Sequence, residues 1–215
     1  MHAIVAGGTG LVGGALLQLL STDARYSRVS ALVRREVTLP PGVTAQPVDF
    51  DHLDDLTLTD VDVAFCCLGT TRKDAGSAAA FRRVDLDYVI AFARLARRAG
   101  AKRFLLVSSI GASARSPFLY PRTKGESEAA VAALGFASVV IVRPSFLVGV
   151  RARGRSGEAA ALRVSEWIRP LLIGPLAKYA PIDAVVVARA LANAALDARE
   201  GVTIIESDRI PTIAR

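Results

Sequence analysis

A tyrosine and a lysine stand four residues apart in the segment YPRTK, at Tyr120 and Lys124. Pro121 suits the first turn of a helix, and residues four apart share one helix face, so the phenol and the ammonium group would lie close together. An adjacent ammonium group favours the phenolate form, which allows proton exchange with a substrate hydroxyl or carbonyl near neutral pH. We interpret Tyr120 and Lys124 as a general acid–base pair. The alternative is a solvated pair on an amphipathic helix.

Two serines lie upstream of this pair. Ser108 and Ser109 follow an apolar run that begins at Phe104. Ligands of open α/β sheets bind outside the carboxyl ends of the strands, so a serine placed there can polarise the same substrate oxygen as Tyr120. Either serine is a candidate for that role.

A glycine-rich turn follows the first apolar run of the chain, in AIVAGGTGLVGGALLQLL at 3–20. Its glycines fit G-x-x-G-x-x-G from Gly7 and G-x-G-x-x-G from Gly8. Glycines at this spacing permit a tight turn, close approach of the backbone to a pyrophosphate, and close packing of helix on strand. The helix that follows would offer free amides and partial positive charge to an anion. We therefore predict a dinucleotide-binding site, with a purely structural turn as the alternative.

Two arginines occupy the end of the second predicted strand. A site for NAD would place an acidic residue there to bond the ribose 2′-hydroxyl, whereas this chain has Arg34 and Arg35. Two guanidinium groups suit a 2′-phosphate because they bind it through paired hydrogen bonds. We therefore favour NADP(H) over NAD(H), the alternative being two solvated arginines. Glu36 lies beyond the strand, and we expect it to form a salt bridge with the arginines.

Strand-like and helical patterns alternate along the whole chain. The apolar runs predicted as strands are 3–6, 29–33, 43–48, 61–68, 104–108, 138–142 and 202–205. The segments predicted as helices are 11–20, 76–98, 121–134, 158–172 and 183–197. This order predicts a Rossmann-type α/β fold, a doubly wound parallel sheet of about seven strands within three α/β/α layers.

The predicted domain covers 1–215 without a repeat or a linker, and a small C-terminal cap over the substrate takes up about 145–182. In the helix predicted over 76–98, apolar residues recur at spacings of three and four and would form one buried face. The residues of that face are Phe81, Val84, Tyr88, Phe92 and Leu95.

Composition excludes several classes of protein. An apolar fraction of 52% with 22% charged residues excludes a disordered chain. The two cysteines, Cys66 and Cys67, are adjacent in a predicted strand, which excludes a disulfide-stapled module and predicts two buried thiols on opposite faces. No apolar run reaches the roughly 18–20 residues of a membrane span, and no signal peptide is apparent, so we expect a cytoplasmic protein.

The net charge of +7 comes mainly from 23 arginines scattered along the chain. Scattered charge with few aromatic residues is typical of a solvated surface, so we expect no nucleic-acid partner. Two histidines are too few for a His-rich metal site, and we expect no metal. The expected partner is a small-molecule substrate; a protein partner and the oligomeric state are left open.

The chain resembles the short-chain dehydrogenase/reductase superfamily, in its extended or atypical branch. It is most similar there to the small Tat-interacting-protein-type oxidoreductases and their bacterial relatives. The resemblance covers nearly the whole chain. The segments that carry it are GGTGLVG at 7–13, AFCCLGTTR at 64–72, VDLDY at 84–88, LLVSS at 105–109, YPRTKGESE at 120–128 and RPSFLVG at 143–149.

The resemblance implies roles for individual residues. Tyr120 would be the proton donor, and Lys124 would hold the nicotinamide ribose and lower the pKa of the tyrosine. The usual spacing of the catalytic serine falls on Val107, and we favour Ser109 over Ser108 because it ends the strand. Asp49 and Phe50 would flank the adenine. The other expected cofactor contacts are Gly7, Thr9, Gly10, Leu11, Val12, Leu68, Gly69, Thr70, Thr71, Arg143, Pro144 and Ser145.

The expected function is therefore an NADPH-dependent oxidoreductase acting on a small carbonyl or alcohol. A non-catalytic sensor of the NADP redox state is one alternative, although relatives of that kind generally lack the Y-x-x-x-K pattern. An epimerase or dehydratase that recycles its bound cofactor is another. The short C-terminal region weighs against a sugar-nucleotide substrate.

Overall fold

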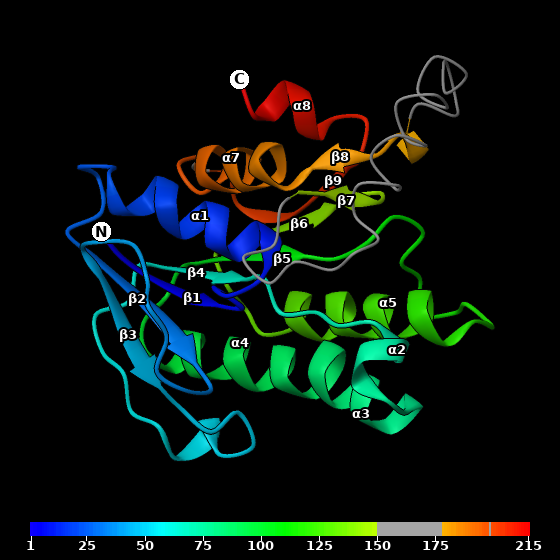
Figure 1. Cartoon of the computed structure of the whole chain (residues 1–215), viewed down its shortest axis with the longest axis horizontal. Helices are drawn as coiled ribbons and strands as arrows, with labels where there is room; N and C mark the ends of the chain where they lie inside the picture. Colours follow the sequence, from blue (N-terminus) through cyan, green and yellow to red (C-terminus); the bar gives the residue numbers. More distant parts are fainter. Residues whose placement is uncertain (150–177, 198) are drawn as a thin grey trace.

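A computed structural model of the chain describes residues 1–149, 178–197 and 199–215 (Figure 1). Within them, seven parallel strands form one sheet in the order β3-β2-β1-β4-β5-β6-β9. The strands are β1 His2–Ala6, β2 Arg28–Val33, β3 Val43–Pro47, β4 Val63–Cys66, β5 Arg103–Val107, β6 Ser138–Arg143 and β9 Gly201–Glu206. The strand order reverses direction between β1 and β4, so a ligand crevice is expected outside their carboxyl ends.

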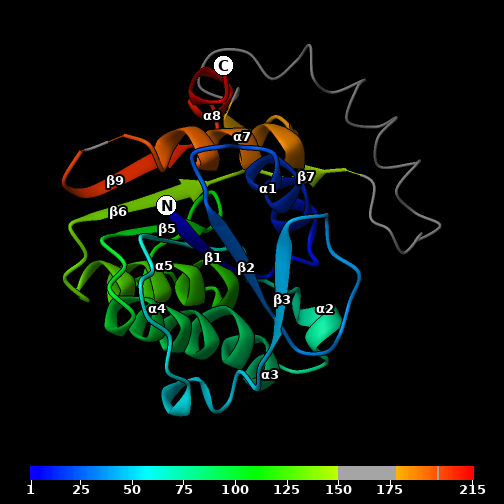
Figure 2. The same cartoon turned by 90° about the vertical axis from the view of Figure 1, so that its left-hand side faces the viewer.

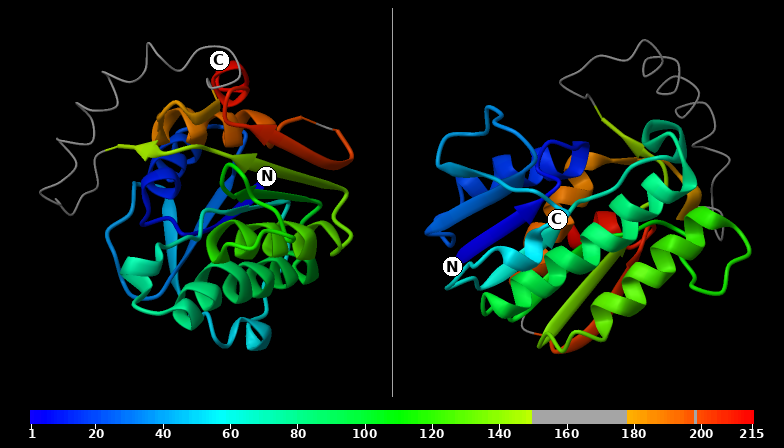
Figure 3. Two further views of the ribbon diagram at one scale, coloured as in Figure 1. Left: turned by 90° about the vertical axis from the view of Figure 1, so that its right-hand side faces the viewer. Right: turned by 90° about the horizontal axis from the view of Figure 1, so that it is seen from below.

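Helices cover both faces of the sheet, which confirms the three-layer α/β/α prediction. One face carries α1 Leu11–Ser21, α7 Ala184–Ala194 and α8 Ile210–Ile213 (Figure 2). The other carries α4 Tyr88–Arg98 and α5 Leu119–Ala132, which lie side by side in Figure 3. Shorter elements are a 3-10 turn Leu53–Asp55, α2 Arg72–Ala75, α3 Ala78–Arg82, a π-helical turn Arg83–Asp87, and a two-stranded sheet of β7 Leu147–Val148 and β8 Ile182–Asp183.

Side chains of the central strands alternate between two apolar cores, one on either face of the sheet. Along β1, Val5 packs toward α1 and α7, and Ile4 packs toward α4. The adjacent cysteines follow the same alternation: Cys66 belongs to the α4 side and Cys67 packs against the α1 side. Burial raises the pKa of Cys66 to about 12 and also raises that of Cys67, so both thiols are held protonated. The predicted placement on opposite faces is confirmed, and Cys66 is buried as predicted, whereas Cys67 is only half-buried.

The helix predicted over 76–98 differs from the structure in its buried face. Val84 and Tyr88 are only half-buried, whereas Asp85 and Val89 are buried. The cause is the π-helical turn Arg83–Asp87, because such a turn accommodates one extra residue and shifts the inward-facing positions by one. The sequence pattern contains no sign of this insertion, so the predicted face was wrong at these two positions.

The helix predicted over 158–172 and most of the predicted cap lie outside the described residues. Among the helices that are described, none is long and apolar enough to cross a membrane. Elsewhere, the predicted strands agree with the structure to within two residues at each end.

Candidate active site

The glycine turn between β1 and α1 forms one wall of the site. Gly7 adopts a left-handed backbone conformation, with φ of +83°, and a side chain there would collide with the carbonyl of Cys67 after β4. The Gly10 amide donates to the Gly7 carbonyl at 3.0 Å, and Gly10 then caps α1 without a side chain. The amides of Leu11, Val12 and Gly13 therefore open the helix with no side-chain acceptor, as an anion-binding helix terminus requires.

Close packing of α1 on this turn also depends on glycine. A side chain at Gly13 would collide with the Gly7 carbonyl, whereas one at Gly14 would make an ordinary contact of 3.5 Å with the Gly8 carbonyl. Thr9 and Gly10 at the tip of the turn are exposed and Leu11 is half-buried. The turn thus presents its backbone to solvent at the carboxyl edge of the sheet.

Arg34 and Arg35 follow β2 at this same edge, because β1 and β2 run parallel with Ala6 paired to Leu32. Both arginines are exposed, and neither forms an ion pair with any described residue. Glu36 is also exposed and unpaired within the described chain, so the predicted salt bridge is wrong. At an exposed position, the entropy lost by ordering two long side chains roughly cancels the favourable free energy of a solvent-screened ion pair. Among the described residues, no acidic side chain competes with an anion for these two guanidinium groups.

A buried ion pair joins α5 to the π-helical turn. The Lys124 ammonium lies 2.7 Å from Asp85 Oδ1, and both side chains are almost fully enclosed. Burial lowers the pKa of Lys124, but the charges of Asp85 and of the Tyr120 phenol raise it by more, so its pKa lies above the ordinary lysine value. Lys124 is therefore a stable cation at neutral pH.

Tyr120 lies one turn before Lys124, in the first turn of α5. Its side chain is 43% exposed, and its ring stacks on buried Phe81 with centroids 5.5 Å apart. This contact fixes the ring while leaving the residue open to solvent. The structure thus brings the predicted tyrosine and lysine together on one helix face.

The two candidate serines differ in accessibility. Ser108 is 5% exposed, its amide donates to the Val142 carbonyl, and its hydroxyl has no hydrogen-bond partner among the described groups. Ser109 is half-buried, and its hydroxyl contacts the Ile110 carbonyl at only 3.5 Å. Both follow the carboxyl end of β5, as predicted, and Ser109 is the more exposed of the two.

The loop from β5 to α5 is held tightly on the helix. The Ser113 amide donates to the Pro121 carbonyl at 2.9 Å, and a side chain at Gly125 would collide with the backbone at Ser113 and Ala114. Gly125 follows Lys124 directly, so the close approach that it permits fixes the loop against the part of α5 that carries the ion pair.

Residues after β4 form a second wall beside Lys124. The Thr70 amide donates to Asp85 Oδ2 at 2.8 Å, and a side chain on Gly69 would stand 3.5 Å from Lys124 Nζ. Leu68 is half-buried, and the Thr71 hydroxyl caps α2 by accepting from the Asp74 amide. Of the four predicted positions 68–71, Gly69 and Thr70 thus lie beside the buried ion pair.

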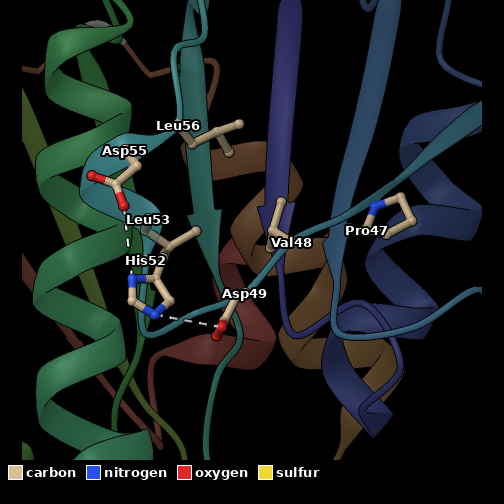
Figure 4. A pocket seen from close by; sticks show the side chains of 7 residues that line it. All are labelled: Pro47, Val48, Asp49, His52, Leu53, Asp55 and Leu56. Carbon is tan, nitrogen blue, oxygen red and sulfur yellow. Dashed lines mark ion pairs between the residues drawn. The ribbon is translucent and has the colours of Figure 1, made fainter.

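A hollow of about 270 Å³ opens after β3 (Figure 4). Exposed Asp49 lies at its rim. The His52 ring stands between two carboxylates, with Nε2 3.9 Å from Asp49 Oδ2 and Nδ1 3.7 Å from Asp55 Oδ2. Phe50 is buried instead and packs on Tyr88 with ring centroids 5.5 Å apart. The described residues hold no cluster that could ligate a metal ion. Of the two positions predicted to flank adenine, only Asp49 is exposed.

The segment after β6 is braced by protein contacts. Arg143 donates hydrogen bonds to Glu128 and Glu206. The bonds that Glu128 accepts raise the pKa of Arg143 against the opposing effect of burial. The Pro144 carbonyl accepts from the Ile110 amide, and the Ser145 hydroxyl donates to the Ala180 carbonyl. These side chains are engaged within the fold, and their predicted contact with a nicotinamide stays a prediction.

A family model described as NAD(P)H-binding matches residues 7–159, which span the glycine turn, the Thr70 loop and α5. The chain belongs to the NAD(P)H-binding family. This assignment agrees with the open amides at the start of α1. It also agrees with the glycine turn, where a side chain at Gly7 or Gly13 would collide with the backbone.

Named relatives of this NAD(P)H-binding chain support the atypical short-chain dehydrogenase/reductase branch. Protein HTATIP2 of Rattus norvegicus is 38% identical over 199 residues, covering 88% of this chain and 78% of that protein. The mitochondrial protein fmp52 of Aspergillus clavatus is 36% identical over 222 residues, covering 97% and 93%. The resemblance to the Tat-interacting-protein-type group is therefore confirmed.

Solved structures show the same fold. The human epimerase family protein SDR39U1 with NADPH superposes with a TM-score of 0.67 at 22% identity, covering 96% of this chain and 74% of that one. MoeE5 in complex with UDP-glucose and NAD gives 0.70 at 18% identity, covering 100% and 81%. The predicted Rossmann-type sheet is thus confirmed.

The sequence reasoning missed Asp85 as a site residue. It lies within the VDLDY segment that carried the family resemblance, and it is an acidic residue between apolar positions of a helix. The available signal was an acidic residue flanked by apolar residues in a predicted helix. A charged residue is buried only when it is paired, so this position could have been tested for a cationic partner.

Proposed function

We propose that this member of the NAD(P)H-binding family is an NADPH-dependent oxidoreductase that reduces a small carbonyl compound or oxidises the corresponding alcohol. The observation that carries the proposal is the placement of an exposed Tyr120 phenol one helical turn before a buried, positively charged Lys124. A tyrosine held in this way is suited to proton transfer at a substrate oxygen.

The residues present fit a bound dinucleotide. The open amides at the start of α1, with the left-handed Gly7, suit a pyrophosphate. Arg34 and Arg35, which pair with no described residue, suit a 2′-phosphate. Lys124 would hold the nicotinamide ribose. When bound, the nicotinamide supplies or accepts the hydride.

The protein handles the proton in this scheme. During reduction, the Tyr120 hydroxyl donates its proton to the substrate oxygen as the carbonyl becomes an alcohol. Ser109, the more exposed of the two serines, donates a hydrogen bond to the same oxygen. The Lys124 cation favours the phenolate that the tyrosine leaves behind.

Replacing the phenol tests the proposal. Tyr120→Phe keeps the ring that stacks on Phe81 and removes the proton donor. Oxidation of NADPH should be followed with a panel of aliphatic and aromatic aldehydes and ketones, and NADPH binding by fluorescence titration. We expect turnover to fall by about 10²- to 10⁴-fold with little change in NADPH affinity. Tyr88→Phe, which keeps its packing on Phe50, is the matched control.

The alternatives predict different results. Full turnover in Tyr120→Phe would rule out the proposed proton donor. A redox sensor would show no turnover and would bind a protein partner differently with NADPH and NADP⁺. An epimerase or dehydratase would convert its substrate without net oxidation of the cofactor.

Cellular location is a separate matter. The fungal relatives carry mitochondrial names, so the cytoplasmic location of this chain stays a prediction. Imaging of a tagged full-length chain in its native cell tests it directly.

A further inference from the structure

One buried carboxylate contacts two separate walls of the candidate active site. Asp85 Oδ1 lies 2.7 Å from the Lys124 ammonium on α5, and Asp85 Oδ2 accepts the Thr70 amide at 2.8 Å from the loop after β4. Asp85 itself has no solvent exposure. The two oxygens of one side chain therefore bridge a backbone group and a cation that belong to different layers of the fold.

We propose that Asp85 is a positioning residue of the site, which holds the Lys124 ammonium and the Thr70 loop in one fixed arrangement for the cofactor. This inference rests on the proposed function, because it assigns Lys124 and the Thr70 loop to NADPH binding. Asp85 acts through these two groups and has no contact with substrate in the scheme.

Local backbone geometry supports a specific role for this carboxylate. Asp85 stands in the middle of the π-helical turn Arg83–Asp87. Such turns are rare in proteins, and those that occur are often found at functional sites. Without the inserted residue, the helical pattern would direct Val84 and Tyr88 inward. The turn directs Asp85 and Val89 inward instead, so it places the acidic side chain opposite Lys124.

The charge on Asp85 is needed as well as its hydrogen-bonding oxygens. An asparagine could still accept from the Thr70 amide, but it would leave the enclosed Lys124 ammonium without a counter-charge, and an unpaired buried charge is strongly unfavourable. The groups that face this ammonium are Asp85 from the π-helical turn, Tyr120 from α5 and Cys66 from β4. Of these, Asp85 alone supplies a carboxylate.

The substitution Asp85→Asn is therefore the test, with Asp87→Asn as its control. Asp87 ends the same π-helical turn, is exposed, and forms no ion pair with the described residues. NADPH affinity is measured by fluorescence titration from neutral to alkaline pH, and the thermal midpoint of each variant is recorded. We expect Asp85→Asn to bind NADPH about 10- to 100-fold more weakly than the unsubstituted chain and Asp87→Asn to match it.

The pH profile separates positioning from simple stabilisation. Burial lowers the pKa of Lys124, and the Asp85 charge raises it. When the Asp85 charge is removed, the effect of burial is no longer offset, so the pKa of the Lys124 ammonium falls. Binding by Asp85→Asn should therefore weaken further as pH rises, whereas binding by the unsubstituted chain and by Asp87→Asn stays level over the same range. A variant that was merely less stable would not acquire this slope while folded.

A second background keeps the proposal testable if Asp85→Asn does not fold. In a chain that carries both Lys124→Met and Asp85→Asn, neither a buried ammonium nor a buried carboxylate is left unpaired. Its NADPH affinity should differ from that of Lys124→Met alone by less than about twofold, because the two residues act as one unit.

Two results would overturn the positioning role. One is an Asp85→Asn chain with the NADPH affinity and pH profile of Asp87→Asn. The other is a Lys124→Met, Asp85→Asn chain that binds NADPH about tenfold more weakly than Lys124→Met alone. If the unsubstituted chain binds NADPH and Tyr120→Phe loses turnover, either result rejects only the role of Asp85. If the unsubstituted chain does not bind NADPH, the proposed function itself fails.

Discussion

The guanidinium of Arg143 faces the carboxylate of Glu128 through two hydrogen bonds, of 3.0 Å from Nε and 2.6 Å from Nη2. A third bond, of 2.8 Å, joins Arg143 to Glu206 at the end of β9. Glu128 lies one helical turn beyond Lys124 on α5. The cluster therefore ties the helix of the proposed site to the two strands at one edge of the sheet.

Glu128→Gln should destabilise the protein strongly, because it leaves the Arg143 guanidinium in a mostly enclosed position without its bidentate partner. Removing one member of a buried pair typically costs about 3 kcal/mol or more of unfolding free energy. Urea denaturation measures this loss. Glu126→Gln on the same helix is the control, since Glu126 is more exposed and its pairing with Arg82 should contribute less than about 1 kcal/mol. Equal effects at the two positions would contradict this reading of the cluster.

Gly13→Ala and Gly14→Ala should have opposite effects although the two glycines are adjacent in α1. The methyl group at Gly13 collides with the Gly7 carbonyl, so the turn must move and NADPH binding should be lost. The methyl group at Gly14 meets no such obstacle, and alanine in a helix interior should stabilise the fold by about 0.5–1 kcal/mol. Fluorescence titration and thermal melting test the pair. An NADPH affinity unchanged in Gly13→Ala would exclude close approach of the cofactor to this turn.

Joint replacement of Arg34 and Arg35 by alanine should weaken NADPH binding by about tenfold or more and leave NADH binding nearly unchanged. The reason is that only NADPH carries the 2′-phosphate that these two exposed guanidinium groups would bind. The control is Arg189→Ala, an exposed arginine on α7. An equal loss for both cofactors would point to a general effect of charge, and no loss for either would reject the assignment.

His2 should make stability depend on pH. Its Nδ1 donates to the Asp60 carbonyl at 3.1 Å, so Nε2 is free to accept from the Ser30 hydroxyl, also at 3.1 Å. Burial lowers the pKa of His2, with the Asp60 bond partly opposing it. As pH falls below about 6.5, the unfolded chain binds the proton first, and the free energy of unfolding therefore decreases.

Urea denaturation between about pH 7 and pH 5 tests this dependence. The decrease toward acid should be smaller in His2→Gln than in the unsubstituted chain. His52→Gln, at an exposed turn, is the comparison variant. A slope that persists undiminished in His2→Gln would assign the effect to other groups.

Local patterns predicted the central strands of the sheet well because these strands are buried on both faces. The run at 3–6 and the first four residues of the run at 104–108 are apolar, and a parallel strand covered by helices on both sides needs that composition. Helix positions were predicted less well where local periodicity was interrupted. The π-helical turn Arg83–Asp87 leaves no mark in the hydrophobic pattern, so the buried face was misplaced at Val84 and Tyr88.

The sequence by itself determined the fold class, the glycine turn at Gly7 and the pairing of Tyr120 with Lys124 on one helix face. Each of these depends on residues close together in the chain, whose spacing directly encodes a turn or a helix face. The tertiary structure alone decided that Asp85 pairs with Lys124, that Arg143 binds Glu128, and that Glu36 binds no described residue. Such pairings depend on which strands become neighbours and on which positions lose contact with water, and the packing of the whole chain sets both.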